Sequence, residues 1–284
     1  MTIAVLGATG GQGGAVVEAL LNAGHRVRAV VRNPAAARAR PLIAAGVDVV
    51  PGEMTDAVSL AAAFRGATAA YALTTPFQDG LEAEIAQGTA IIEAAARASL
   101  PHLVMASVAS ADRHTGIPHF ETKARIEQAL SETDLPATVV APTYFYDNAL
   151  GALQEVAAGE ITMALPADTP LQQVSRLDLG RVVAAIVADP GRWIGRRIEI
   201  AGDDPTPAQM ARAVAAAAGG PVTFRSIPLE LVRQTSPDMA AMFAYLTESG
   251  YHVDLAALRA DFPGISWLSF ADWAEQQTWP VPGR

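Results

Sequence analysis

A glycine-rich stretch near the start of the chain constrains the fold more than any other feature. The sequence GATGGQG at residues 7–13 follows the apolar run TIAVL at residues 2–6 and precedes a helical pattern at residues 14–24. A second apolar run, RVRAVVR, comes next at residues 26–32. Strand, glycine turn, helix and strand in this order predict a βαβ unit whose turn allows a ligand to approach the backbone closely.

The spacing of these glycines indicates a phosphate site. It is G-x-x-G-x-x-G, whereas the basic dinucleotide fingerprint is G-x-G-x-x-G and has its second glycine where this chain has threonine. Backbone N–H groups and the positive dipole end at the start of a helix favour an anion. We predict a pyrophosphate site, with a tight turn in an ordinary αβ unit as the alternative. The expected cofactor-binding residues of this turn are Gly7, Thr9, Gly10, Gln12 and Gly13.

Strand and helix patterns continue to alternate up to about residue 145. Strand-like apolar runs recur at residues 47–50, 69–74, 102–107 and 137–142, with helical patterns between them. Runs that are apolar throughout are typical of parallel strands buried on both faces. The sequence therefore predicts an α/β fold with a doubly wound parallel (Rossmann) sheet of about six strands.

The pattern of the chain changes after this point. Residues 164–178 are polar and rich in turn formers, and Thr206 followed by Pro207 has the signature of a helix start. We expect an NAD(P)-binding Rossmann domain over residues 1–145, to which the chain returns around residues 174–202. Residues 146–284 are then expected to form a smaller C-terminal α+β domain that binds substrate or acts as a lid.

The end of the second strand distinguishes the two nicotinamide cofactors. NAD-binding folds usually place Asp or Glu about 20 residues beyond the glycines, where the carboxylate binds the ribose 2′-hydroxyl. This chain has Arg32 there and no acid beside it. A guanidinium suits the dianionic 2′-phosphate of NADP, so we predict that NADP(H) is preferred over NAD(H), with added charge from Arg38 and Arg40. The alternative for Arg32 is a solvated strand end.

Composition and charge exclude several classes of partner. A net charge of -9, with only 20 lysines and arginines, argues against nucleic-acid binding. The chain has no cysteine, and its five histidines show no ligand spacing, so we expect no metal. No apolar run reaches the roughly 18 residues of a membrane span, and the N-terminal stretch lacks the charged start of a secretory signal. We expect a cytoplasmic protein.

The stretch HFETK at residues 119–123 holds the candidate catalytic groups. The stretch resembles the Tyr-x-x-x-Lys motif of ordinary short-chain dehydrogenases, whose two side chains lie one helical turn apart: in that motif the lysine holds the ribose, and the tyrosine moves the proton. Lys123 matches the lysine, whereas His119 stands at the tyrosine position. We predict that Lys123 binds the ribose. His119 either supplies the proton, since histidine titrates near neutrality, or only lines the pocket.

Hydroxyl groups that follow the predicted strands are further candidates, because ligands of open α/β sheets bind outside the carboxyl ends of the strands. Thr74 follows the fourth strand and is expected to contact the cofactor. Ser107 follows the fifth strand and is a candidate catalytic residue that bonds a substrate carbonyl or the nicotinamide, with a strand cap as the alternative. The aromatic run at residues 144–146 is more typical of core packing than of a substrate site.

Together these motifs resemble the NmrA-like proteins of the atypical short-chain dehydrogenase/reductase superfamily. The resemblance covers about residues 1–200 and is carried by GATGGQG, VVRNP, GEMTD, HFETKARIEQAL and PTYFYDN. It implies an NAD(P)-binding Rossmann domain followed by a small substrate domain. It also implies cofactor contacts from Met54 in GEMTD and from Phe145 in PTYFYDN.

The resemblance leaves two functions open, because this group contains reductases of quinones and related substrates as well as non-catalytic sensors of cofactor redox state. We expect an NADP(H)-dependent oxidoreductase that transfers hydride between the nicotinamide and a small quinone or carbonyl acceptor. The alternative is an NmrA-type sensor that acts through protein partners. The missing tyrosine disfavours a sugar-nucleotide or isoflavone-type enzyme. The sequence does not identify the substrate or the oligomeric state.

Overall fold

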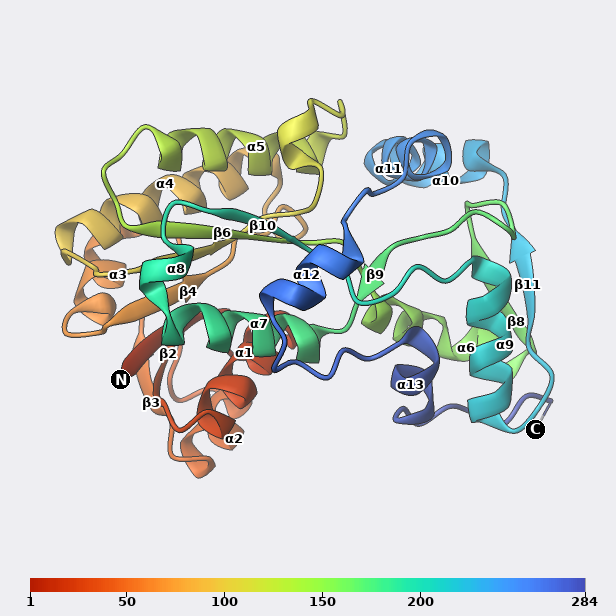
Figure 1. The fold of residues 1–284 in the computed structure, drawn as a ribbon, viewed down its shortest axis with the longest axis horizontal. Coiled ribbons are helices and arrows are strands. Elements are labelled where there is room, and N and C mark those ends of the chain that lie inside the picture. Colours follow the sequence, from red (N-terminus) through yellow and green to blue (C-terminus); the bar gives the residue numbers. More distant parts are fainter. Residues whose placement is uncertain (284) are drawn as a thin grey trace. The chain divides into compact units, whose positions relative to one another are not determined.

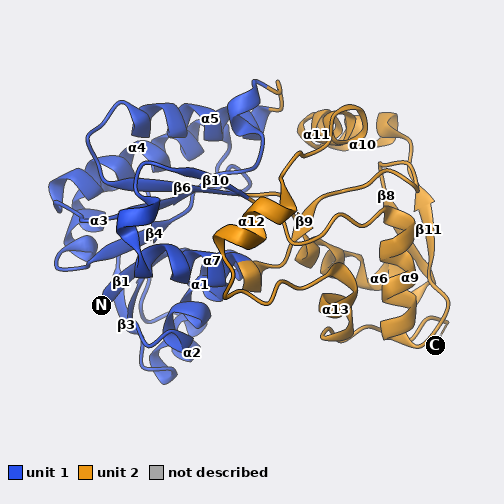
Figure 2. Ribbon diagram, in the orientation of Figure 1, with its two compact units in different colours: residues 1–114, 118–141, 179–199 blue, residues 115–117, 142–178, 200–284 orange. Residues whose placement is uncertain are grey.

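The chain forms two compact units in this computed structural model, which describes residues 1–283 (Figure 2). Unit 1 contains residues 1–114, 118–141 and 179–199, and unit 2 contains residues 115–117, 142–178 and those from 200 onward. The second domain expected from the sequence extends to residue 284, which lies outside the described residues.

Unit 1 is built on a seven-stranded sheet (Figure 1). Its strands are β1 (Thr2–Leu6), β2 (Arg26–Val31), β3 (Asp48–Pro51), β4 (Ala69–Ala72), β5 (Leu103–Ala106), β6 (Ala137–Pro142) and β10 (Arg197–Ile200). They lie in the order β10-β6-β5-β4-β1-β2-β3, and the pairings from β3 through to β6 are parallel. An order of 3-2-1-4-5-6 is that of a doubly wound dinucleotide-binding sheet. The predicted fold class is therefore confirmed.

Helices cover both faces of this sheet (Figure 1). They are α1 (Gly11–Asn22), α2 (Arg40–Ala44), α3 (Ala57–Phe64), α4 (Leu81–Arg97), α5 (Pro118–Ser131), α7 (Arg176–Ala188) and α8 (Pro190–Trp193), with short 3-10 turns η1 (Ala37–Ala39) and η2 (Ala111–Arg113). Side chains alternate between the faces of a strand: Ala4 and Leu6 of β1 belong to the core cluster shared with α3, α4 and α5. A Cβ on Gly180 of α7 would lie 2.5 Å from the Ala15 carbonyl oxygen of α1, so these two helices cross closely.

Two elements of unit 1 differ from the sequence expectation. The helical pattern at residues 34–46 forms only η1 and the five-residue α2, because Pro41 is confined to the first turn of a helix and Gly46, at φ +78°, ends it. Strand β3 is partly exposed rather than buried on both faces, since it lies at the edge of the sheet.

Unit 2 combines short helices with two small sheets. Its elements are β7 (Tyr144–Phe145), η3 (Tyr146–Ala152), α6 (Leu153–Ala157), β8 (Glu160–Met163), β9 (Gln173–Val174), α9 (Pro207–Ala218), β11 (Thr223–Ser226), α10 (Leu229–Thr235), α11 (Pro237–Glu248), α12 (Leu255–Asp261) and α13 (Phe270–Glu275). Strand β8 pairs with β11 and β7 with β9, both in parallel. Thr206 forms a capping box with Gln209 and Pro207 opens α9, as the sequence predicts.

Buried aromatic rings form part of the core of unit 2. The Tyr146 ring is fully buried and lies 5.5 Å from that of Phe270 and 5.8 Å from that of Trp273, measured between ring centroids. Tyr146, from the aromatic run 144–146, is therefore a core residue.

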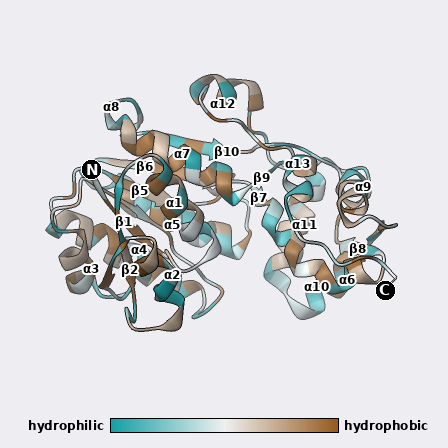
Figure 3. Cartoon of the chain, turned by 90° about the horizontal axis from the view of Figure 1, so that it is seen from below, coloured by the Kyte–Doolittle hydropathy of each residue, from teal (hydrophilic) through white to brown (hydrophobic). Residues whose placement is uncertain are grey.

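In unit 1 the hydrophobic residues are concentrated on strands such as β1 and β2, which are mostly brown in Figure 3. No helix within residues 1–283 is long and apolar enough to cross a membrane.

Candidate cofactor and catalytic site

The turn between β1 and α1 has the backbone geometry of an anion site. Gly7 has φ +67°, in the left-handed region that favours glycine. Its carbonyl accepts a hydrogen bond from the Gly10 N–H at 2.8 Å, which closes the turn. Within the described residues no side chain caps α1 at Gly10, and no acidic residue lies in the first helical turn. The positive end of α1 is therefore not neutralised by a carboxylate of its own.

Gly10 and Gly13 of the motif have different surroundings. A Cβ on Gly13 would lie 2.3 Å from the Gly7 carbonyl oxygen, so only glycine allows α1 to pack this closely against the turn. A Cβ on Gly10 would meet only the same oxygen, at 3.3 Å, and Gly10 is exposed. Gly13 is thus needed for packing, whereas Gly10 lies on the open side of the turn together with the exposed Thr9.

Gln12 connects the turn to the sheet. Its side-chain N–H donates to the Tyr71 hydroxyl at 2.6 Å, and Tyr71 is fully buried on β4. Burial raises the pKa of Tyr71, so its hydroxyl stays protonated. The hydrogen bond holds the first turn of α1 on the neighbouring strand and engages the Gln12 amide within the protein.

Two further residues that are predicted to contact the cofactor follow β2 and β3, which lie on the side of β1 away from β4. Arg32 follows β2 and is exposed, and its guanidinium makes no ion pair within residues 1–283. Arg28, earlier on the same strand, instead pairs with Asp48 at 2.9 Å and bonds two backbone carbonyls. Met54 follows β3, is half-buried and packs against the core cluster of unit 1. Arg32 is therefore an exposed arginine at the carboxyl end of β2, where its charge is available to a ligand.

Lys123 lies in a dense polar network between α5, α4 and the end of β4. Its Nζ donates to the Thr74 carbonyl oxygen at 2.8 Å and to the Thr74 hydroxyl at 2.8 Å, and it lies 2.9 Å from Glu84 Oε1. An ammonium group has three N–H donors, so the protein supplies an acceptor for each. Burial lowers the pKa of Lys123, and the carboxylate of Glu84 opposes this shift.

Glu84 is a member of this network that the sequence reasoning missed. It is fully buried and accepts hydrogen bonds from the hydroxyls of Thr74 and Thr122. A close crossing brings it to Lys123, because a Cβ on Gly88 of α4 would lie 2.5 Å from the Ile126 side chain of α5. The available signal was helical spacing: residues 84, 88, 91 and 95 form one buried stripe of α4, which places a carboxylate among core residues.

His119 lies one helical turn before Lys123 on α5 and contacts two aromatic rings. Its ring centroid is 4.8 Å from that of Phe120 and 5.9 Å from that of Phe77. Phe77 belongs to the loop after β4 and is 73% exposed. His119 is half-buried, so the imidazole lies beside an exposed aromatic group at this edge of the sheet.

Ser107 directly follows β5 and is buried. Its hydroxyl donates to the carboxylate of Glu127, which lies one helical turn beyond Lys123 on the same face of α5. Arg197 of β10 donates to the other oxygen of this carboxylate at 2.8 Å. Sequence reasoning missed Glu127, although its spacing of four from Lys123 was visible. It also missed Arg197, which only the sheet order brings to this position.

The sheet thus brings most of the predicted residues to the carboxyl ends of its parallel strands. The glycine turn, Thr74 and Ser107 follow β1, β4 and β5, which are neighbours in the sheet, and Thr74 bonds Lys123. Phe145 instead lies on β7 in unit 2, where the Arg176 guanidinium lies 5.6 Å from the centre of its ring.

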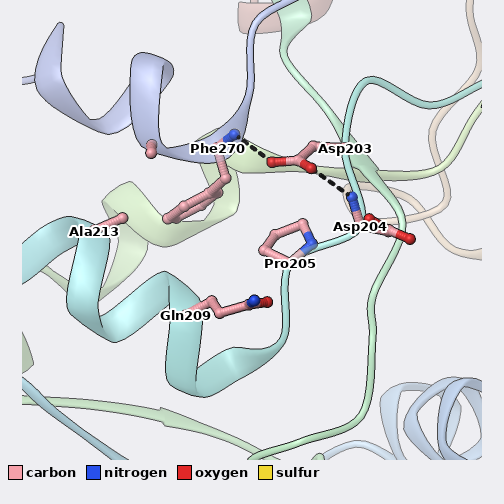
Figure 4. A pocket seen from close by; sticks show the side chains of 7 residues that line it. Asp203, Asp204, Pro205, Gln209, Ala213 and Phe270 are labelled. Atoms are coloured by element: carbon pink, nitrogen blue, oxygen red, sulfur yellow. Dashed lines mark hydrogen bonds between the residues drawn. The ribbon is translucent and has the colours of Figure 1, made fainter.

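A separate hollow of about 270 Å³ lies in unit 2 (Figure 4). It is lined by Asp203, Asp204, Pro205, Gln209, Ala213, Phe270 and Ala271. One oxygen of the Asp203 carboxylate accepts the Asp204 N–H and the other accepts the Phe270 N–H, each at 2.9 Å. This carboxylate therefore fixes the backbone around the hollow.

Known proteins resemble this chain over most of its length. The sequence model of the NmrA-like family matches residues 1–268. The NAD(P)H azoreductase of Xenophilus azovorans is 29% identical over 239 residues, which cover 84% of this chain and 81% of that protein.

Two solved structures have the same fold. An NADPH-dependent quinone oxidoreductase from Escherichia coli, solved with NADPH, superposes with a TM-score of 0.80 at 23% identity and covers 96% of this chain and 98% of its own. NmrA, described as a negative transcriptional regulator, also has a TM-score of 0.80 at 23% identity, over 97% and 94% of the two chains. At this level of identity the two structures show a shared fold.

Proposed function

The chain belongs to the NmrA-like family, and we propose that it is an NADP(H)-dependent oxidoreductase that transfers hydride between the nicotinamide and a small quinone or carbonyl acceptor. The azoreductase and the quinone oxidoreductase named above carry out chemistry of this class according to their names. Both names support a planar, conjugated acceptor for this chain as well.

The turn from Gly7 to Gly13 is the observation that carries the proposal. Gly10 is exposed and carries no side chain, so an anion can approach the backbone there. No carboxylate in the first turn of α1 competes with that anion, and the N–H groups of the helix start favour it. These features fit the pyrophosphate of a dinucleotide.

Arg32 supports NADP(H) as the preferred cofactor. Its guanidinium is exposed at the end of β2 and forms no ion pair within residues 1–283. A 2′-phosphate would form charge-assisted hydrogen bonds with it. The ribose 2′-hydroxyl of NAD(H) carries no charge, so its hydrogen bond with this guanidinium would stabilise the complex less.

Groups on α5 and after β4 then have separate roles in catalysis. A bound reduced nicotinamide supplies a hydride, which is two electrons and one proton. The acceptor needs one further proton, which His119 donates to a carbonyl oxygen, whereas a quinone also takes it from solvent. Lys123 and Thr74 hold the end of β4 in place beside the ribose.

Loss of NADPH absorbance at 340 nm tests this function directly. A panel of quinones, aldehydes and enones is offered at high protein concentration, with cofactor binding measured separately by fluorescence. We expect NADPH to bind and at least one quinone or carbonyl to be reduced above background. Binding without reduction of any acceptor would reject the oxidoreductase.

One observation favours a second candidate, a sensor of cofactor redox state that acts through protein partners. Each of the three Lys123 N–H donors has an acceptor inside the protein, so the lysine reaches a ribose only if one of these contacts is exchanged. The regulator NmrA has the same fold. A sensor would bind a partner protein with different affinities in its NADP and NADPH forms and would reduce no acceptor.

A further inference from the structure

We propose that Glu127 fixes the Ser107 hydroxyl as a hydrogen-bond acceptor toward the bound ligand, and that this oxygen receives the carboxamide N–H of the nicotinamide. The inference rests on the proposed function, because it requires a nicotinamide cofactor in the site. In this arrangement Glu127 is a positioning residue that acts through Ser107.

The direction of the hydrogen bond between Ser107 and Glu127 follows from the second partner of the carboxylate. Arg197 donates its Nε–H to Glu127 Oε2 at 2.8 Å. The carboxylate of a glutamate paired with arginine accepts hydrogen bonds and has no proton to donate. Ser107 therefore gives its single hydroxyl proton to Glu127. Its oxygen is left with lone pairs and no proton to offer.

Arg197 is itself held in place, so the carboxylate cannot readily change partners. Its guanidinium lies 3.0 Å from Glu199 Oε1 and donates to the Val108 carbonyl oxygen at 3.0 Å. The side chains of Arg197 and Glu127 are 21% and 13% exposed. The orientation of the Ser107 hydroxyl is thus set by a partly buried network that includes α5 and β10.

The position of Ser107 in the sheet identifies the ligand group. Ser107 follows β5, which lies two strands from β1, so at about 4.8 Å per strand the two strand ends are roughly 10 Å apart. A dinucleotide with its pyrophosphate at the turn after β1 extends along this edge in both directions. Arg32, after β2, suits the adenosine phosphate, which directs the nicotinamide half toward β4 and β5.

The carboxamide of the nicotinamide is a group with both an N–H donor and a carbonyl acceptor. Only its N–H can pair with an oxygen that has no proton to donate. The same reasoning removes the alternative in which Ser107 donates to a substrate carbonyl. Ser107 would then help to set which face of the ring is presented to the acceptor.

Two cofactors that differ in this one group test the inference. NADPH is compared with its reduced 3-acetylpyridine analogue, in which a methyl group replaces the carboxamide NH₂, and the dissociation constants are measured by calorimetry. Loss of one ordinary hydrogen bond predicts that the native protein binds NADPH about threefold to tenfold more tightly than the analogue.

The variant Glu127→Gln should abolish or reverse this preference. Its amide oxygen must face Arg197, so its NH₂ faces Ser107, and the serine then donates toward the ligand. Glu199→Gln is the matched control, since it removes the same charge from the Arg197 network without contacting Ser107, and it should keep the preference. If Glu127→Gln does not fold, Ser107→Ala replaces it and should bind both cofactors equally.

The outcomes separate this inference from the proposed function. Equal binding of the two cofactors by the native protein, or an unchanged preference in Glu127→Gln or its replacement Ser107→Ala, would overturn the role of Ser107 and leave cofactor binding intact. Failure of the native protein to bind NADPH at all would reject the proposed function, and this inference with it.

Discussion

Lys123 and Glu84 form a buried ion pair, with 2.9 Å between Nζ and Oε1 and the carboxylate fully excluded from solvent. Such a pair contributes little net stability, because burial costs both charges their hydration, but loss of one partner leaves the other charge without compensation. Variants of Lys123 are therefore expected to affect folding in addition to the proposed contact with the cofactor, and the two effects must be separated.

The first prediction concerns this pair. Lys123→Met should lower the free energy of unfolding by about 3–5 kcal/mol, because it leaves Glu84 buried and unpaired. The double variant Lys123→Met/Glu84→Gln should recover part of that loss, since a neutral amide needs no counter-ion. Urea unfolding followed by circular dichroism measures both. Equal stability of the single and double variants would show that the two charges are not energetically coupled. Ribose binding without Lys123 is best measured in the double variant, because Glu84 is not left charged and unpaired there.

The second prediction separates the two glycines of the turn. Gly13→Ala should destabilise the fold by about 1–3 kcal/mol through overpacking, because its Cβ would lie 2.3 Å from the Gly7 carbonyl oxygen. Gly10→Val should stay folded and lose NADPH binding, because its side chain would occupy the approach to the backbone. Thermal unfolding and cofactor titration check the pair. Full NADPH affinity in a folded Gly10→Val protein would exclude the turn as the pyrophosphate site.

The third prediction concerns cofactor choice. Arg32→Ala should weaken NADPH binding by about 1.5–3 kcal/mol, the contribution of one hydrogen bond to a charged group, and should leave NADH binding nearly unchanged. Arg26→Ala is the matched control, because Arg26 is also exposed but lies at the amino-terminal end of β2, away from the carboxyl ends of the strands. Titration of both cofactors gives the result, and equal affinities of the native protein for NADPH and NADH would contradict the assignment.

The fourth prediction tests the proton donor. His119→Ala should lower kcat with carbonyl acceptors by roughly 10²–10⁴-fold, the usual contribution of general acid catalysis, and should change quinone reduction little. His252→Ala, an exposed histidine of unit 2, serves as the control. A similar, small effect on both acceptor classes would leave His119 as a residue that only lines the site.

The fifth prediction concerns pH and stability. His102 is 2% exposed, and burial lowers its pKa to about 4 from 6.5. The unfolded chain therefore binds a proton between pH 6.5 and pH 4 that the folded chain does not, so stability falls as pH decreases through this window. The loss from this residue should be about 2 kcal/mol between pH 7 and pH 5. Urea unfolding at both pH values should show a smaller decrease for His102→Gln than for the native protein.

The amino-acid pattern alone establishes the class of fold and the location of its glycine turn. Apolar runs and helical patterns alternate over short distances, and this local periodicity reports secondary structure directly. The order of the elements then favours a parallel doubly wound sheet, because crossover connections have one hand. The spacing of four between His119 and Lys123 likewise places both on one face of a helix, since that relation depends only on helical periodicity.

The contacts of these side chains follow instead from tertiary packing. Glu84 lies 39 positions before Lys123 in the chain, and Arg197 lies 70 positions after Glu127; helix crossing and strand order bring each pair together. Sequence periodicity carries no information about such distant partners, because it reports which face a residue occupies and not what that face meets. Only the folded chain therefore determines two features of the site. The Lys123 N–H donors are hydrogen-bonded within the protein, and the Ser107 hydroxyl donates to Glu127. Both features depend on the packing of α5 against elements far away in the sequence.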